Sequence, residues 1–368
     1  MKRFIVLVGA IAIVSMSALS AGMFGFVRPA DGDAAAGEDG ADRKGSVWVV
    51  NRDRGTLTIF DAATGHPLPG TPLDVGTGAH DICISEQTGK AYITAEMDNA
   101  VTVVDTDTLQ KYSIPVGPMP HHLEPSNDGH TLYVTLLSHT AGGNGGQYAV
   151  IDTRDDSVIY RPSSPDAGTR SHAITPTLDG ETLYITHDIG NRVTSVNAES
   201  GAINFTLLNI PRAEETVASR SGELLWVSAR GGNSVMPVDL TSNPVAVMEP
   251  ILVGSQPESM MLTPNERTLV VSLRGSPASL SFVDTRTLTA FPLVRIGPED
   301  TSLGDLAVMT QNGHFVYASY DNNIAGTGGV AVVDVRTREL VDRWQYPTPG
   351  RPHGIWYSKK TPRAVASR

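Results

Sequence analysis

Short apolar runs recur along the chain at intervals of roughly forty to fifty residues, most of them directly after a turn rich in Gly, Asn or Asp. Their β-branched and aromatic residues are typical of buried strands. In chain order the runs are SVWVV (46–50), AYIT (91–94), TLYVT (131–135), TLYIT (182–186), LLWVS (224–228), TLVVS (268–272) and FVYAS (315–319). The pattern predicts one such strand in each repeat.

A second kind of run follows each of these strands and ends in an acid or, once, in Asn197. The acids are Asp61, Asp105, Asp152, Asp239, Asp284 and Asp334. Because each is followed by a short polar turn sequence, we expect its carboxylate to accept backbone hydrogen bonds there rather than to do chemistry. With one strand before and one after this pair, each repeat has four short antiparallel strands. That unit, repeated seven times, predicts an all-β, seven-bladed β-propeller.

The two ends of the chain complement each other in this scheme. The first run, at 46–50, has no strand of the preceding kind before it, whereas PHGIWYS (352–358) supplies one at the far end. We therefore expect the C-terminal strand to join the N-terminal blade and close the ring, which removes an open sheet edge. The predicted propeller domain spans residues 46–359, followed by a tail at 360–368.

The runs AYIT, LYVT and LYIT, each followed by a strand ending in V-V-D, V-I-D or the related S-V-N, resemble the YVTN-type propeller repeats of exported bacterial proteins. The resemblance covers residues 46 to about 359 and implies the seven-bladed fold. It does not imply one activity, because related propellers include binding proteins, electron-transfer subunits, lactonases and lyases.

The N-terminus has the pattern of an export signal. Lys2 and Arg3 precede an uncharged, mostly apolar stretch that passes through small residues near Ala21. We predict a signal peptide at 1–21, a disordered linker at 22–45 and a periplasmic or other extracytoplasmic location. The uncharged stretch continues to Val27, so an uncleaved membrane anchor is the alternative.

Charge, cysteine content and missing motifs narrow the range of possible functions. The net charge of −11 opposes nucleic-acid binding, which needs a basic surface. The one cysteine, Cys83, cannot form an intramolecular disulfide and is expected to be a small buried apolar residue. Motifs for a serine nucleophile, a phosphate-binding loop or covalent haem attachment are missing from the sequence.

One position just before the turn of each repeat, here called the slot, holds a polar residue in all seven repeats. In order the slot residues are His80, His121, His172, Glu214, Glu258, Asp305 and His353. In a closed ring they converge on one axis. Four neighbouring imidazoles predict a transition-metal site for Fe, Cu or Zn, with His80, His121, His172 and His353 as ligands. The alternative is a hydrogen-bonded polar plug without metal.

The three slot acids are expected to surround the metal ligands. Glu214 neighbours His172 and Asp305 neighbours His353, so each could accept the outer N–H of a ligating imidazole. Glu258 could be a further ligand, a base or a solvated charge. His122, beside His121, is expected to face a blade interface or the channel wall.

Loops after the second strand of each blade lie on the same face as the slot. They include Arg52, Glu96, Arg230, Arg274 and Tyr320. Arg230 and Arg274 follow the strands next to Glu214 and Glu258, so they either pair with these acids or, with Tyr320, bind a substrate anion.

Three kinds of function remain open. The first is a metalloprotein acting as an oxidoreductase or as a metal carrier; a four-histidine ring with outer acids is similar in composition to the iron site of carotenoid-cleaving oxygenases. The second is a non-catalytic propeller that binds a protein or cell-envelope partner. The third is a metal-assisted hydrolase or lyase in which Glu258 or Glu214 moves a proton. The expected partner is a small molecule or a metal-handling protein, and a membrane only if the N-terminal segment stays uncleaved.

Overall fold

The computed structural model describes residues 43–137, 147–160, 170–322, 328–346 and 350–363. The predicted signal peptide, all but the last residues of the predicted linker and most of the predicted tail lie outside these ranges. None of the helices in the described ranges has the length and apolar content that a membrane crossing requires.

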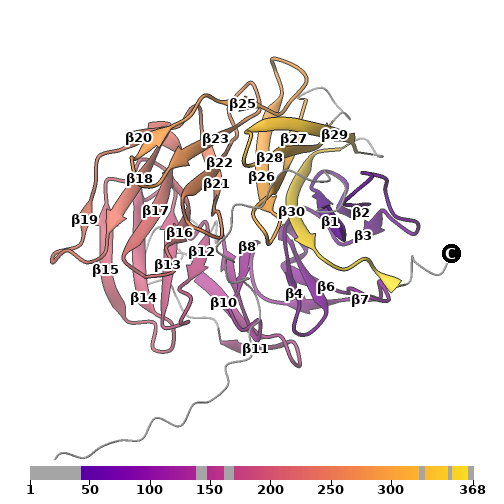
Figure 1. The fold of residues 1–368 in the computed structure, drawn as a ribbon. Coiled ribbons are helices and arrows are strands. Elements are labelled where there is room, and N and C mark those ends of the chain that lie inside the picture. The colour runs from indigo at the N-terminus through magenta and orange to yellow at the C-terminus, as the bar shows by residue number, and fades with distance from the viewer. Residues whose placement is uncertain (1–42, 138–146, 161–169, 323–327, 347–349, 364–368) are drawn as a thin grey trace, which may run out of the picture.

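The described strands form seven antiparallel sheets arranged around a central axis (Figure 1). The innermost strands are β4 (Ala79–Ser85), β8 (Pro120–Pro125), β12 (Ile174–Pro176), β16 (Ala213–Ala218), β21 (Pro257–Leu262), β26 (Leu303–Met309) and β30 (Pro352–Ser358). The second strands are β1 (Ser46–Asn51), β5 (Lys90–Ala95), β9 (Thr131–Leu136), β13 (Thr182–His187), β17 (Leu224–Ala229), β22 (Thr268–Leu273) and β27 (Phe315–Asp321). The seven-bladed propeller predicted from the repeats is therefore confirmed.

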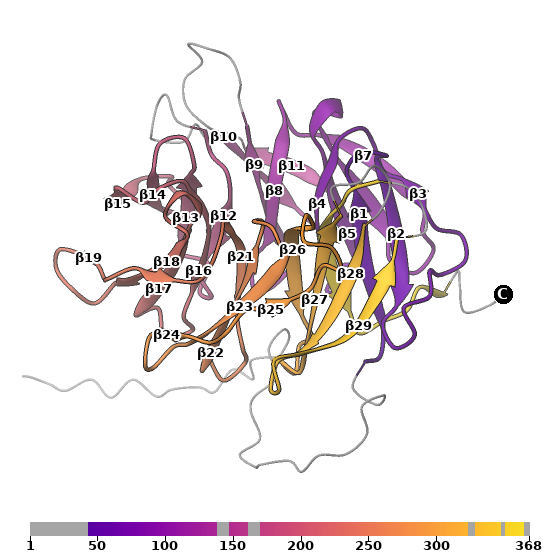
Figure 2. The same ribbon diagram turned by 90° about the horizontal axis from the view of Figure 1, so that it is seen from above.

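The outer half of each blade is less regular. The third strands are β2 (Thr56–Asp61), β6 (Ala100–Asp105), β10 (Gln147–Asp152), β14 (Arg192–Asn197), β18 (Ser234–Asp239), β23 (Ser279–Asp284) and β28 (Gly328–Asp334). The outermost strands are β3 (Leu73–Asp74), β7 (Lys111–Pro115), β11 (Ser157–Tyr160), β15 (Ile203–Leu208), the pair β19 (Ala246–Val247) and β20 (Ile251–Leu252), the pair β24 (Thr289–Ala290) and β25 (Val294–Arg295), and β29 (Glu339–Gln345). In two views at right angles, β19 lies at the outer rim (Figure 2). Two short 3-10 helices follow second strands, η1 (Glu96–Asp98) and η2 (Arg230–Gly232).

The ring closes as predicted, because β30 pairs with β1 in the sheet β3-β2-β1-β30. Ser46 lies opposite Ser358, and Trp48 lies opposite Trp356. Two hydrogen bonds fasten the ends: the Ser46 hydroxyl donates to the Lys360 carbonyl (2.6 Å), and the Tyr357 hydroxyl donates to the Lys44 carbonyl (2.7 Å). The last strand of the chain thus completes the first blade.

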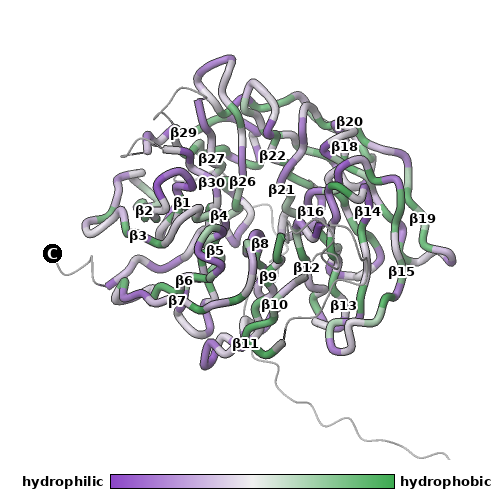
Figure 3. The backbone as a smooth tube through the Cα atoms, turned by 180° about the vertical axis from the view of Figure 1, so that it is seen from behind, coloured by the Kyte–Doolittle hydropathy of each residue, from purple (hydrophilic) through white to green (hydrophobic). Residues whose placement is uncertain are grey.

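The hydrophobic core is divided among the blade interfaces. Seven clusters of buried side chains each combine residues from two neighbouring blades. Because both faces of a blade are covered, the central strands carry apolar residues in continuous runs, while hydrophilic residues gather in turns (Figure 3). Cys83 lies fully buried in one of these clusters, in agreement with its predicted packing role.

The acids that end the third strands form the predicted turn contacts. Asp61 Oδ1 accepts hydrogen bonds from the backbone N–H of Ala63 and Thr64, and Asp284 Oδ1 accepts from Arg286 and Thr287. Asn197 Oδ1 likewise accepts a hydrogen bond from the backbone N–H of Ser200. These carboxylates hold the blade turns.

Candidate metal centre

The slot residues lie on or directly before the innermost strands, around the axis. His80 is in β4, His121 in β8, Glu214 in β16, Glu258 in β21, Asp305 in β26 and His353 in β30, while His172 lies two residues before β12. All seven side chains are buried. The repeat therefore delivers one buried polar side chain per blade to the same end of the axis.

A β-bulge at the slot lets two consecutive side chains reach the axis. Ala79 pairs with Ala95 and Ile82 with Ile93, so His80 and Asp81 have no residue paired opposite them in the strand register. The same shift occurs in four other blades, at the slots of His121, Glu214, Glu258 and Asp305. Bulges re-aim side chains in this way and are common beside functional sites. The residue after the slot, such as Asp81 or His122, thereby lines the channel.

The histidines pack against one another at the axis. The His80 ring centroid lies 3.9 Å from that of His121 and 3.9 Å from that of His353. The His121 and His172 centroids are 4.7 Å apart, so the four slot imidazoles form a continuous row. The adjacency that the ring order predicted is present in the structure.

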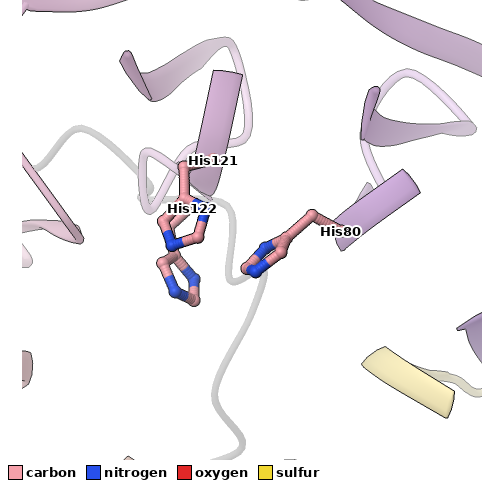
Figure 4. A group of neighbouring side chains, drawn as sticks. All are labelled: His80, His121 and His122. Carbon is pink, nitrogen blue, oxygen red and sulfur yellow. The ribbon is translucent and has the colours of Figure 1, made fainter. Parts of the chain in front are cut away.

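A tighter group within this row consists of His80, His121 and His122, which we call the triad. One ring nitrogen from each of the three lies within 4.8 Å of the others. Figure 4 shows the three rings turned toward a common space, with His80 entering from one strand and the adjacent pair His121 and His122 from the next. The sequence placed His122 only as a supporting residue, whereas the bulge makes it a full member of the group.

Carboxylates orient two of the triad imidazoles. His121 Nδ1 lies 2.6 Å from Glu96 Oε1, and the other oxygen of Glu96 accepts a hydrogen bond from Arg52 (2.8 Å). His122 Nδ1 lies 3.0 Å from Asp81 Oδ2. An imidazole that donates one N–H to a carboxylate presents its other nitrogen to a metal, and such outer partners are typical of metal sites. Glu96 and Arg52 were expected on this face, but their contacts with the histidines depend on the tertiary structure.

Several nitrogen atoms of this cluster lack hydrogen-bond partners among the described residues. They are His80 Nδ1, His122 Nε2 and both ring nitrogens of His353. His353 Nε2 lies 3.2 Å from Asp305 Oδ1 but outside hydrogen-bonding geometry. Buried polar atoms without partners are costly. Two of the triad imidazoles thus have a buried nitrogen without a protein partner among the described residues, and the three rings have metal-ligand spacing, so the residues present fit a metal ion.

The protonation states also suit metal binding. Burial, followed by the charge of neighbouring histidines, lowers the pKa of His80 and of His121 well below the ordinary value. Burial, followed by the charge of Arg274, does the same to His353. These imidazoles are therefore neutral near pH 7, which is the form that binds a metal.

The other half of the slot ring is an alternating series of acids and arginines. Arg230 lies 3.0 Å from Glu214 and 2.9 Å from Glu258, and Arg274 lies 3.4 Å from Glu258 and 3.1 Å from Asp305. Of the two roles considered for Arg230 and Arg274, the structure thus shows pairing with the slot acids. Repulsion among the carboxylates is relieved by these arginines and does not require a metal ion.

His172 belongs to this charged half as much as to the histidine row. Its Nε2 lies 2.9 Å from Glu214 Oε2, and its Nδ1 hydrogen-bonds the Glu214 carbonyl (3.0 Å). His172, Asp188 and Glu214 form a second group with metal-ligand spacing. Arg170 already pairs with Asp188, and Arg212 and Arg230 pair with Glu214. We therefore regard this second group as an ion-pair network.

The acids differ in their ability to exchange protons. Burial opposes ionisation of Glu214, but His172, Arg230 and Arg212 outweigh it and lower its pKa. Burial raises the pKa of Asp305 to about 6, reinforced by Glu258 and opposed by Arg274. A carboxylate with a lowered pKa is a weak base, so Glu214 is poorly suited to the proton-transfer role considered for it.

Tyr320 is placed differently from the expectation. It is fully buried in the hydrophobic cluster between the blades of β22 and β27, among Val270, Leu280 and Val316. It does not belong to the described lining of the channel. Its aromatic ring fills the blade interface, so the structure gives it a packing role rather than the predicted contact with substrate.

Comparison with known proteins supports the fold and goes no further. No protein-family model matches the chain, and no curated protein sequence matches it. Among solved structures, a functionally unknown protein from Desulfotomaculum acetoxidans is similar with a TM-score of 0.69 and 11% identity, over 86% of this chain and 99% of that one.

Two further solved structures have stated activities. The periplasmic gluconolactonase PpgL of Pseudomonas aeruginosa is similar with a TM-score of 0.65 and 17% identity, over 85% of this chain and 98% of that one. The dihydro-heme d1 dehydrogenase NirN, in complex with DHE, is similar with a TM-score of 0.59 and 16% identity, over 86% of this chain and 76% of that one. At these identities the likeness shows the seven-bladed fold alone. Membership of the YVTN-type family in particular stays a prediction from the repeats.

Proposed function

We propose that this protein is an exported metalloprotein that holds a transition-metal ion at the inner end of its axial channel. The observation that carries the proposal is the triad, in which nitrogens of His80, His121 and His122 lie within 4.8 Å of one another. Two of these residues have a buried ring nitrogen without a partner among the described residues, and two are oriented by carboxylates. Fe, Cu and Zn are the metals that imidazole ligands favour.

His353 and His172 extend the ligand set that the slot pattern predicts. His353 contacts His80, and neither of its ring nitrogens makes a hydrogen bond among the described residues, so it is the better placed of the two to act as a fourth ligand. His172 is held by Glu214 at both nitrogens. We propose the triad as the core of the site, with His353 as the additional ligand.

An enzyme fits this arrangement better than a carrier does. Four histidine ligands fill a tetrahedral site but leave an open position on a metal that takes five or six ligands, such as Fe, and an open position is the mark of a catalytic metal. A metal bound there would supply a Lewis acid or, for Fe or Cu, a redox couple. Burial and neighbouring charges keep His80, His121 and His353 neutral, and Glu96 and Asp81 align His121 and His122. The axial channel gives a small molecule access from one side.

Of the two enzymatic alternatives, oxidoreductase is favoured over hydrolase or lyase. A hydrolytic mechanism needs a base near the metal, and the slot acids considered for that role are engaged by arginines: Glu214 by Arg212 and Arg230, and Glu258 by Arg230 and Arg274. The likeness to a periplasmic lactonase and to a dehydrogenase concerns the fold and does not decide between them.

A non-catalytic propeller remains the second candidate, and the acid–arginine series is the observation that favours it. In this half of the ring arginines pair with the carboxylates without metal, as in a polar plug, although Glu214 Oε2, Glu258 Oε2 and Arg230 Nε make no hydrogen bond among the described residues. A polar plug does not explain why His80, His122 and His353 have buried ring nitrogens without hydrogen-bond partners among the described residues. Export is proposed from the N-terminal sequence, and the periplasmic lactonase with the same fold is consistent with it.

Metal analysis of protein purified from a metal-replete periplasm tests the proposal. We expect about one equivalent of Fe, Cu or Zn per chain, and a midpoint of thermal unfolding that rises when the metal is returned to chelator-treated protein, since a ligand that binds only the folded state stabilises it. Electron spin resonance would separate redox metals from zinc. Folded protein that takes up none of the three metals, with no change in thermal midpoint, would leave the polar plug as the better account.

The pH dependence of metal affinity is a further expected result. Burial opposes the charged form of His122, but the hydrogen bond and charge of Asp81 outweigh it and raise its pKa. His80 and His121 are already neutral, so His122 alone must release a proton when the metal binds. Below the pKa of His122 the affinity should fall about tenfold per pH unit, because one proton competes with one metal ion.

The variant Asp81→Asn should move this fall to lower pH. Without the carboxylate, burial dominates and lowers the pKa of His122, so the proton competes only in more acidic solution. Fluorescent-chelator competition between pH 5 and 8 would measure the affinity of both proteins. The midpoint of the pH profile is the readout, since Asp81→Asn also loosens His122 and lowers the plateau. Identical midpoints would show that His122 is not a ligand.

A further inference from the structure

The axial channel continues beyond the triad as a cavity of about 500 Å³. Innermost strands of all seven blades line it, from the residues after the slot, such as Asp81 and His122, to the turns after those strands. Gln87, in one of these turns, is exposed, so the channel opens on the face opposite the slot. Its volume is in the range of pockets that hold small organic ligands.

Acidic side chains are concentrated at the inner end of this channel. Asp81, Glu124 and Glu215 come from β4, β8 and β16 and surround His122, with Asp81 at 3.0 Å and Glu215 at 3.9 Å from its Nδ1. Arg220, in a turn, is the only lysine or arginine in the described lining. Glu124 and Glu215 have no lysine or arginine partner among the described residues, and burial raises the pKa of each to about 8, so both are largely protonated near pH 7 until a cation lies beside them.

The walls between this acidic end and the mouth are largely apolar. Val217, Met261, Val308 and Trp356 line this part of the channel and are only partly buried. A partly exposed tryptophan and methionine inside a channel offer a surface for an apolar body. The channel reaches the triad itself, because His122 belongs to its lining.

We propose that the channel binds a small amine with an apolar body, its ammonium group against Asp81, Glu124 and Glu215 and its apolar part along Val217, Met261 and Trp356. Carboxylates bind an ammonium group through charge-assisted hydrogen bonds, and the apolar walls remove the rest of the molecule from water. The ligand site stands on the channel itself. Its assignment as the substrate site, with the amine end beside the metal, rests on the proposed function.

Binding of 2-phenylethylamine, with 3-phenylpropionate as a matched anion, tests the proposal. Calorimetry and the fluorescence of Trp356 would follow both probes in metal-loaded and chelator-treated protein, with Trp356→Phe identifying the fluorescence of that residue. We expect the amine to bind both forms at least tenfold more tightly than the acid. The double variant Glu124→Gln/Glu215→Gln should weaken amine binding at least tenfold, whereas Glu199→Gln, on an exposed turn, should leave it unchanged.

The outcomes separate this proposal from that of the metal centre, because metal content is measured on the same samples. Metal-loaded, folded protein that binds neither probe would overturn the ligand site and leave the metal site standing. Equal binding of amine and acid, or full amine binding by the double glutamine variant, would overturn the role of the carboxylates. Met261→Trp, which fills the channel from its wall, should abolish binding; retained binding would place the amine elsewhere.

Discussion

Replacing His121 with alanine is expected to abolish stoichiometric metal binding. His121 is one of the two inner rings of the histidine row, in contact with His80 and His172, and its Nδ1 hydrogen-bonds Glu96, which Arg52 also contacts. Affinity should fall by about a hundredfold or more, since loss of an outer hydrogen-bond partner alone costs roughly 10–100-fold. Elemental analysis and chelator competition on the purified variant measure the effect.

The control is His66→Ala, which removes an exposed histidine in the loop after β2. This change should leave the metal content unchanged. Glu96→Gln separates orientation from ligation, because it keeps the ring nitrogens and weakens only the outer contact. We expect it to reduce affinity by roughly 10–100-fold. Full metal content in a folded His121→Ala protein would refute the triad as the site.

Comparison of the remaining histidines would define the ligand set. His80→Ala and His122→Ala should behave like His121→Ala if the triad is the core. His353→Ala should reduce affinity by less, and His172→Ala should act mainly by leaving Glu214 without its imidazole partner. Equal losses in His80, His121, His172 and His353, with none in His122, would instead restore the four-slot site that the repeat pattern predicts.

Ending the chain at Gly350 is expected to prevent folding. The deletion removes β30, which pairs along β1 and contributes buried Ile355 and Tyr357 to the cluster between the first and last blades. Truncating one large buried side chain costs about 2–5 kcal/mol, whereas whole domains are stable by about 5–15 kcal/mol. It also leaves β1 as an open edge, which favours aggregation.

Circular dichroism and thermal unfolding would measure this result. The shortened chain should show no cooperative transition, and most of it should be insoluble. Ending the chain at Pro362 is the control, because it keeps β30 and the contact of Ser46 with Lys360 and should unfold like the full chain. A cooperative transition in the chain that ends at Gly350 would mean that the other six blades are stable without closure.

Much of this architecture can be predicted from local sequence patterns. Apolar runs at regular spacing, with turn residues between them, specified strand number, blade number and the closing role of residues 352–358. The reason is that each blade is a local antiparallel unit whose hydrogen bonds join neighbours in sequence, so periodicity and turn chemistry suffice. The slot, too, was visible as a repeated position.

The partners of the slot residues were less visible, because they come from other blades or from loops. Arg230 contacts Glu214 of its own blade and Glu258 of the next, and Glu96 contacts His121 across a blade interface. Such contacts depend on the rotation between blades and on side-chain conformation. Neither of these produces a repeated pattern in the sequence. The burial of Tyr320 also depends on contacts between blades. Its position at the end of a predicted second strand suggested that it faces the channel, but it is packed between two blades.

By itself, the sequence determined a closed seven-bladed ring with one polar side chain per blade near its axis, because hydrophobic periodicity and turns act over short distances. Only the tertiary structure decided which of those side chains gather. The bulge brought His122 in beside His80 and His121, the arginines neutralised the acidic half, and the lining of seven strands made a channel with acids at its inner end. These features arise from residues distant in the chain that meet only when the ring closes.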